Sequence, residues 1–153
     1  MSADFEIVDH GWNKIKKELE SFAKDRNNYI TVGLHKGKKR VQIGFWNEFG
    51  TKNKDHSERI PERPFLQSSL YEKPVKDIET LISKEIQMIY LGGKYIVLLT
   101  RLGMHCKAFV KKQIIDKEIF KPNKASTIAR KGFDHPLWET GEMYNEIDFK
   151  LGK

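Results

Sequence analysis

Two stretches of apolar residues with helical spacing lie on either side of a glycine pair, Gly92-Gly93, and they constrain the fold most. Residues three and four apart share one face of a helix, so each stretch predicts a helix with one buried side. Glycines end helices, so we expect two antiparallel helices joined there; one long helix kinked at the pair is the alternative. The stretches contain Ile78, Leu81, Ile82, Ile86 and Ile89, then Tyr95, Leu98, Leu99, Leu102, Cys106, Phe109, Val110 and Ile114.

Shorter regular segments lie towards both ends of the sequence. Apolar residues spaced three to four apart over 12–22 predict an amphipathic N-terminal helix of about four turns, which ends before Asn27-Asn28. Apolar and polar residues alternate over 29–35 and again over 145–151. This period of two predicts a half-buried strand in each place.

The region between the first strand and the long helices is less regular. Within 41–50, Val41, Ile43 and Phe45 fit a returning strand, whereas Val41, Phe45 and Phe49 fit one face of a helix. Both interpretations remain open. Residues 36–40 are expected to form a basic turn, and 51–57 an exposed loop. Pro61 and Pro64 predict an extended stretch, with Pro64 suited to the first turn of a helix.

These segments predict a single α+β domain over residues 1–153. We expect a small antiparallel or mixed sheet of three to four strands, packed against two long helices plus an N-terminal helix. A chain of 153 residues is long enough to bury one core, and it contains no internal repeat or linker.

Composition excludes several classes of protein. The only cysteine, Cys106, excludes an intrachain disulfide and a multi-thiolate zinc site. No apolar run approaches the ~18 residues of a membrane span, so we expect no membrane association. Residues 1–6 lack the basic and apolar regions of a secretory signal.

No catalytic, cofactor-binding or metal-binding pattern is present in the sequence. The five histidines lie far apart, and no glycine-rich phosphate loop occurs. Cys106 falls within an apolar stripe, which is typical of a small buried hydrophobic residue. A hydrolase that pairs Cys106 with a distant histidine is the one enzymatic alternative. We expect a protein without enzymatic activity or cofactor.

Positive charge is concentrated in one part of the chain. The formal net charge is +7, and residues 107–131 hold eight basic and two acidic residues, a net +6. Such a segment predicts contact with an anionic partner, so a basic nucleic-acid-binding module is the alternative function. The solvated face of a lysine-rich helix is the simpler interpretation. The candidate basic face is Lys107, Lys111, Lys112, Lys117, Lys121, Lys124 and Arg130.

Three motifs in a fixed order resemble those of one known family. Phe45–Thr51 is similar to an xNEFGT segment, and Ile60–Leu66 to IPARPFL, with Glu62 in place of a small residue. Residues 127–132 and 136–143 resemble TIxxKG followed by PLxDTGxL, with Glu139 in place of aspartate. The family is that of bacteriophage minor tail components, the tail-completion or head–tail joining (neck) proteins of long-tailed phages. The resemblance spans about residues 29–150.

The resemblance implies a structural virion protein with no catalytic residues. Such proteins form a homo-oligomeric ring, commonly a hexamer, between the tail tube and the head connector. The implied partners are other neck, tail-tube, tail-terminator or connector proteins, with non-specific contact to DNA in the channel. Assembly in the host bacterial cytoplasm and a place in the neck or tail of the particle are implied as well. The motif residues expected at interfaces are Asn47, Glu48, Phe49, Gly50, Thr51, Pro61, Arg63, Pro64, Phe65, Lys131, Gly132, Pro136, Leu137, Thr140 and Gly141.

The motif residues also suggest specific contacts. Arg63 lies between two prolines on a stiff backbone that fixes the direction of its guanidinium, and we expect a bidentate ion pair with Glu48. Exposure of Arg63 to solvent is the alternative. Phe65 is expected to anchor a helix start in the core. Thr140 is expected to cap a helix, with Met143 packed beneath it.

Overall fold

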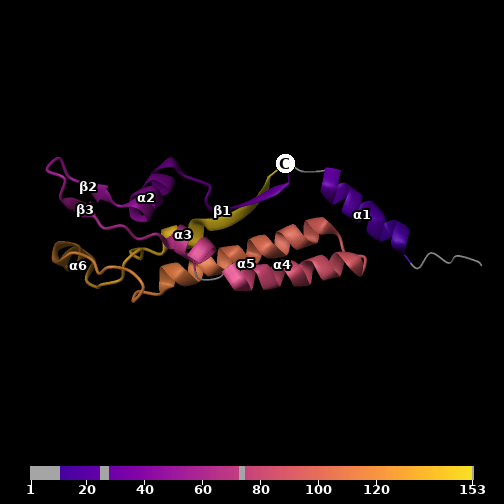
Figure 1. Ribbon diagram of the computed structural model, residues 1–153. Helices are drawn as coiled ribbons and strands as arrows, with labels where there is room; N and C mark the ends of the chain where they lie inside the picture. Colours follow the sequence, from indigo (N-terminus) through magenta and orange to yellow (C-terminus); the bar gives the residue numbers. More distant parts are fainter. Residues whose placement is uncertain (1–10, 25–27, 73–74, 153) are drawn as a thin grey trace, which may run out of the picture.

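Two long antiparallel helices run along the molecule (Figure 1). The computed structural model describes residues 11–24, 28–72 and 75–152. Helix α4 spans Val75–Tyr90 and α5 spans Tyr95–Ile115. Gly92 has φ 87°, and the backbone N–H of Gly93 donates to the carbonyl oxygen of Met88 at 2.9 Å, so the glycine pair closes α4. The prediction of two helices is confirmed, and the kinked single helix is excluded.

Strands β1 (Tyr29–Leu34) and β4 (Ile147–Gly152) pair antiparallel, and the pair packs on α5. Both strands were predicted, although the second begins at Ile147 and the predicted residues 145–146 are helical. A Cβ at Gly103 of α5 would lie 2.4 Å from Cδ2 of Phe149. The glycine therefore lets β4 lie directly on the helix.

A second pair of strands forms a separate hairpin, β2 (Thr51–Lys52) with β3 (Glu58–Ile60). In the described part of the chain the four strands thus form two two-stranded sheets. The α+β class is confirmed, but the single sheet of three to four strands is not found. The predicted loop 51–57 is wrong at its start, because Thr51–Lys52 form β2, and residues 53–57 are the exposed tip of the hairpin.

The ambiguous segment is helical. Helix α2 spans Lys38–Phe49, so the predicted basic turn is in part the first helical turn. A Cβ at Gly44 would lie 2.4 Å from Cδ1 of Leu34, so this glycine brings α2 close to β1. Its apolar residues Val41, Phe45 and Phe49 remain exposed, which explains why periodicity did not identify the element.

Four short helical elements complete the fold: α3 (Phe65–Gln67), the π-helix η1 (Ser68–Glu72), α6 (Ala125–Lys131) and α7 (Glu142–Glu146). The polar composition after residue 122 gave no indication of α6. Helix α1 (Trp12–Lys24) packs on α4 and α5 at the opposite end from α2 and α6 (Figure 1). Asn27 of the predicted turn lies outside the described residues. So do residues 1–6, for which no secretory signal was expected.

The core has two parts. The larger holds Phe65, Val110, Ile114, Phe120, Met143 and Ile147, where α5 meets α3, α7 and β4. The smaller holds Ile89, Leu98 and Leu99, near the α4–α5 turn. Phe65 is fully buried, as the sequence predicted. Among the described residues no helix combines the length and apolar character that crossing a membrane requires.

Candidate functional site

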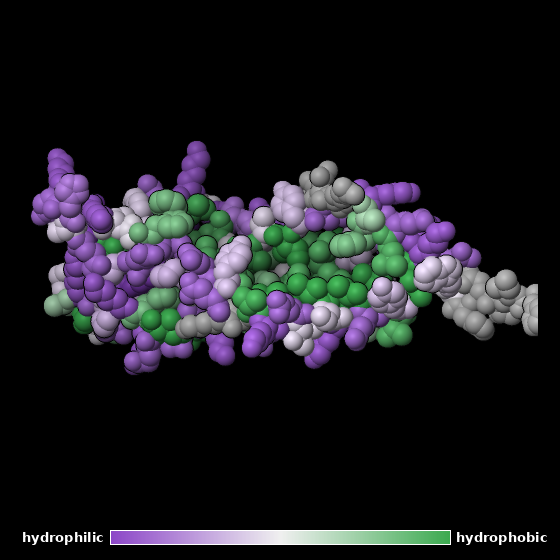
Figure 2. Space-filling model, in the orientation of Figure 1, coloured by the Kyte–Doolittle hydropathy of each residue, from purple (hydrophilic) through white to green (hydrophobic). Residues whose placement is uncertain are grey.

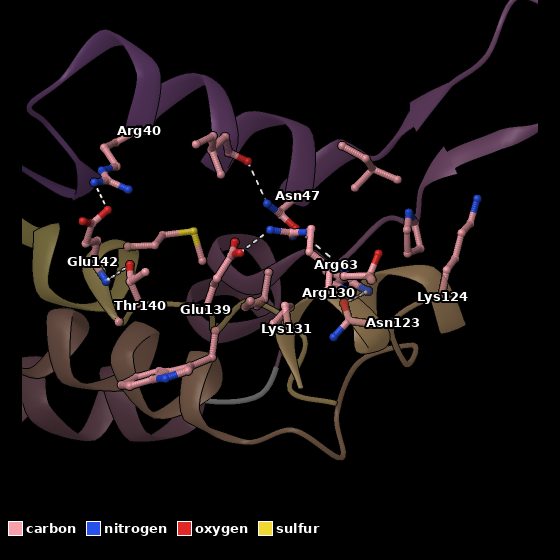
Figure 3. Close-up of a pocket in the computed structure, with 18 of the residues that line it drawn as sticks. Arg40, Asn47, Arg63, Asn123, Lys124, Arg130, Lys131, Glu139, Thr140 and Glu142 are labelled. Atoms are coloured by element: carbon pink, nitrogen blue, oxygen red, sulfur yellow. Dashed lines mark hydrogen bonds and ion pairs between the residues drawn. The ribbon is translucent and has the colours of Figure 1, made fainter. Parts of the chain in front are cut away.

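A groove of about 310 Å³ lies at the end of the molecule that carries α2, the hairpin and α6 (Figure 3). Side chains reach it from α2, from residues 59–63, from 123–131 and from 137–143. The motif segments, distant in sequence, therefore meet here. The predicted residues that line it are Asn47, Pro61, Arg63, Lys124, Arg130, Lys131, Leu137, Thr140 and Gly141.

Arg63 is 5% exposed and holds this end of the molecule together. Its Nε and Nη2 both donate to the carbonyl oxygen of Lys121 at 3.2 Å. Nη2 also donates to Oδ1 of Asn123 at 3.1 Å, and Nη1 to Oδ1 of Asn47 at 3.5 Å. Burial lowers the pKa of Arg63, although the charges of Asp134 and Glu58 oppose this. The predicted ion pair with Glu48 and the solvent-exposed alternative are both wrong.

Glu48 has a different role. Its Oε2 accepts the backbone N–H of Leu66 at 2.9 Å, and its Oε1 accepts that of Gln67 at 2.8 Å. The carboxylate therefore caps the start of α3, where backbone N–H groups have no partner within the helix. Burial raises the pKa of Glu48 despite these hydrogen bonds, and the charge of Glu62 adds to the effect.

Two ion pairs cross the groove. Arg40 pairs with Glu142, and Arg130 pairs with Glu139 (Figure 3). Lys131 instead donates to the carbonyl oxygen of His135 at 2.6 Å. The sequence singled out neither Arg40 nor Glu142 as a site residue, because each is an ordinary charged residue on the surface of its own segment.

The predicted cap of α7 is one residue out of place. Gly141, with φ 75°, occupies the N-cap position, and Oγ1 of Thr140 accepts the N–H of Glu142 at 3.4 Å. A Cβ at Gly141 would lie 3.1 Å from Cζ2 of Trp138, so the tight turn also depends on this glycine. Met143 is buried beneath it, as predicted.

The other motif residues shape the surrounding backbone. Gly50, with φ 67°, lies between α2 and Thr51 of β2, and a Cβ there would be 3.0 Å from the carbonyl oxygen of Ile60. Pro64 directly precedes α3. Gly132, with φ 80°, ends α6, and Pro136 is buried in the turn that follows.

The basic residues of 107–131 do not form a single free face. Lys107 pairs with Asp148 at 2.8 Å, and Lys121 with Glu58 at 2.9 Å. Carboxylates from distant segments thus offset part of the predicted local excess. Lys111 lies over the ring of Tyr144 at 4.5 Å, Lys117 pairs with Glu118 at 3.6 Å, Lys124 donates to the carbonyl oxygen of Glu58 at 2.6 Å, and Lys112 is exposed.

A second groove of about 510 Å³ lies on the other side of α2 and is mainly apolar. Phe45 is 59% exposed and Phe49 61% exposed, and their ring centroids are 4.8 Å apart. Tyr71 faces the same groove and is 75% exposed. The sequence named Phe49 as an interface candidate but gave no indication of the groove, which requires α2 and η1 to lie side by side.

No cluster of metal-binding side chains is found in the part of the chain that the structure describes: in residues 11–24, 28–72 and 75–152 no three side chains of His, Cys, Asp or Glu are close enough to hold an ion. Cys106 is half-buried, and burial raises the pKa of its thiol, which disfavours a nucleophilic thiolate. Comparison of the chain with protein-family models, curated proteins and solved structures gives no significant match.

Proposed function

We propose that this chain is a structural virion protein of a tailed bacteriophage. It forms an oligomeric ring, a hexamer, at the neck or tail-completion position and joins the tail tube to the head connector. The observation that carries the proposal is the meeting of the motif segments around one groove. Residues 45–66 and 127–143 resemble the tail-completion family, and a shared surface is what an assembly interface would require.

Exposed apolar surface supports an assembly function. Figure 2 shows a broad hydrophobic area across the middle of one face and hydrophilic side chains at the end that carries α2 and the hairpin. Exposed apolar patches of this kind mark protein–protein contacts in soluble proteins. Leu91 is 78% exposed at the α4–α5 turn, and Ile96, Val97 and Met104 of α5 are exposed as well. A subunit of a ring would bury such surface.

The proposed activity is assembly rather than catalysis. The raised thiol pKa of Cys106 argues against the hydrolase alternative. The ion pairs of Lys107 and Lys121 weaken the argument for a nucleic-acid-binding module, because a lysine held by a carboxylate contributes less to phosphate neutralisation.

Locating the chain in phage particles would test the proposal. Antibodies raised against the purified protein should decorate the neck, between head and tail, in electron micrographs. Particles produced without the gene should accumulate as separate heads and tails. Antibody labelling at another part of the particle would overturn the proposal. So would normal joining of heads to tails in particles produced without the gene. A filter-binding titration at two salt concentrations addresses the alternative, for which a steep loss of DNA binding with salt is expected.

A further inference from the structure

The groove at the α2–α6 end carries an excess of positive charge. Six basic and two acidic side chains line it. Within the described residues, only Arg40 and Arg130 pair with carboxylates there. The other four are Arg59, Arg63, Lys124 and Lys131, and among the described residues none has a carboxylate within ion-pair distance. Asp134 and Glu58 lie outside the lining and offset this excess in part.

The hydrogen bonds of these cations explain why the charge remains available. Arg63 and Lys131 donate to carbonyl and amide oxygens, which are neutral. Burial lowers the pKa of Lys131, and repulsion by the charge of Arg63 adds to this effect, although the charges of Glu139 and Asp134 oppose it. The side chain of Arg59 has no hydrogen-bond or ion-pair partner in the described part of the chain, and this exposed residue also lines the groove. An anionic group placed here would relieve this repulsion.

The rest of the lining favours a peptide over a nucleic acid. Ile43, Leu137, Trp138 and the largely buried Met143 also line the groove. A peptide with apolar side chains next to its negative charges would contact both kinds of lining residue. A phosphodiester backbone has none. Moreover, the groove arginines already bind carboxylates, those of Glu139 and Glu142.

This chain contains a segment with the required composition. Residues 4–9 read Asp-Phe-Glu-Ile-Val-Asp, three acidic and three apolar side chains. They lie outside the described residues and lead to Gly11, which directly precedes α1. The segment thus matches both the charge and the apolar character of the groove.

The segment cannot reach the groove of its own chain. Lys14 of α1 lies beside the α4–α5 turn, since a Cβ at Gly92 would be 3.4 Å from its Nζ. The groove lies at the other end of α5, a helix of 21 residues, about 30 Å long. Figure 1 shows α1 at the end opposite α2 and α6. Residues 4–9 precede Gly11 by two to seven positions, so they lie at most ~25 Å from it.

We propose that the α2–α6 groove binds residues 4–9 of a second copy of this chain. The contact is heterologous, because the α1 end of one subunit meets the α2–α6 end of the next, and contacts of this kind close into rings or extend into filaments. The proposal deepens the proposed function by naming one contact of the ring, and it relies on that function only for the ring itself.

A synthetic peptide of residues 1–11 tests the contact with the full-length protein. We expect saturable binding, measured by fluorescence anisotropy of the labelled peptide. A peptide with Asn, Gln and Asn in place of Asp4, Glu6 and Asp9 should bind at least about tenfold more weakly. The double variant Arg59→Glu/Lys124→Glu should weaken binding of the natural peptide similarly. Both side chains are exposed, so the variant should fold, which circular dichroism would verify.

A charge swap and a matched control make the test specific. A peptide carrying Asp4→Lys and Glu6→Lys should regain affinity for the Arg59→Glu/Lys124→Glu protein, which happens only if segment and groove meet. Lys54→Glu reverses an exposed charge of the same hairpin outside the groove and should leave binding unchanged.

Three results would overturn the inference: no saturable binding, equal binding to the groove variant, or no recovery in the charge swap. Binding of a short DNA duplex that the groove variant abolishes, without peptide binding, would instead assign the groove to phosphate. If the peptide does not bind, the proposed location of the chain in the neck of the particle is unaffected. If the chain is absent from phage particles, the peptide could still bind the groove. The two proposals are therefore separable.

Discussion

Arg63 donates two hydrogen bonds to the carbonyl oxygen of Lys121, from Nε and from Nη2, each at 3.2 Å. The residues are 58 positions apart in the sequence, and the contact joins the exit of the hairpin to the segment that follows α5. Because the partners are neutral oxygens, Arg63 both fixes the groove and leaves it positively charged.

Replacement of Arg63 by alanine should lower the free energy of unfolding by about 2–4 kcal/mol. The substitution leaves part-buried acceptors at Lys121 and Asn123 without this donor, and an unsatisfied buried group costs about 1–3 kcal/mol. Arg63→Lys should recover only part of the loss, because an ammonium group cannot donate in the planar fork geometry of a guanidinium. Urea unfolding measures both. Arg59→Ala is the matched control and should change stability by no more than about 0.5 kcal/mol; an equal loss there would contradict the role of Arg63.

The buried cap at Glu48 predicts a specific pH dependence. Its pKa is raised in the folded protein, so the folded state holds the proton more tightly than the unfolded state. The contribution of Glu48 to stability is therefore largest at low pH and falls as the pH rises through the raised pKa. The difference in unfolding free energy between the wild type and Glu48→Gln should decrease as the pH rises from the ordinary glutamate range through this raised pKa, and then level off. Urea unfolding over a series of pH values measures this difference. If the difference instead increases with pH, the hydrogen bonds from the N–H groups of Leu66 and Gln67 lower the pKa of Glu48 by more than burial raises it.

The sequence predicted the elements whose pattern comes from burial on one side. The stripe of α5 and the alternation in β4 both reflect contact with the core, so both were identified from the residues alone. Helix α2 remained ambiguous because Phe45 and Phe49 lie on its exposed side, so its apolar pattern does not report a buried face. Helix α6 was missed because it is short and buries none of its residues.

Side-chain partners at the site were harder to predict than elements. Arg63 and Glu48 were both recognised as important, and both are buried, but each bonds to backbone that only the tertiary fold brings near. The opposite charges of the two residues suggested an ion pair. The sequence does not indicate that the carbonyl group of Lys121 lies near Arg63, or that the N–H group of Leu66 lies near Glu48. The basic face was likewise inferred from local charge, whereas its offsetting carboxylates, Asp148 among them, come from elsewhere in the chain.

Gly103→Ala should destabilise the protein although alanine is the better helix former. The added methyl group would lie 2.4 Å from Cδ2 of Phe149, so β4 must move away from α5. We expect a loss of about 1–3 kcal/mol from overpacking, against a helix-propensity gain of about 1 kcal/mol. His105→Ala, exposed on the same helix, is the control and should be neutral or slightly stabilising. Thermal and urea unfolding would decide, and a stabilised Gly103→Ala protein would mean that β4 does not rest on this glycine.

Cys106 should react slowly with alkylating reagents in the native protein. Its thiol is half-buried and its pKa is raised, so less thiolate is present at a given pH than for an exposed cysteine. Iodoacetamide labelling at mildly alkaline pH, followed by mass spectrometry, should be several-fold slower than labelling of the urea-unfolded chain. Because Cys106 is the only cysteine, Cys106→Ser provides an unlabelled control. Labelling as fast in the folded as in the unfolded protein would revive the hydrolase alternative.

The exposed aromatic pair of α2 should contribute to self-association rather than to stability. Phe45 and Phe49 are mostly exposed in the isolated chain, so replacing both by glutamate removes little buried area and should change the unfolding free energy by about 0.5 kcal/mol or less. In an assembled ring the same change would place two charges in a desolvated contact, which costs much more. Sedimentation velocity over a range of concentrations should therefore show weaker association for Phe45→Glu/Phe49→Glu than for the wild type.

Gln42→Glu is the matched control for this pair, since it adds a negative charge to an exposed position of the same helix without removing aromatic surface. It should associate like the wild type. If both variants weaken association equally, the effect is one of charge alone. If neither does, the apolar groove beside α2 lies outside the subunit contacts. Loss of association in the aromatic variant alone, with unchanged urea unfolding, would identify this groove as a contact surface of the assembly.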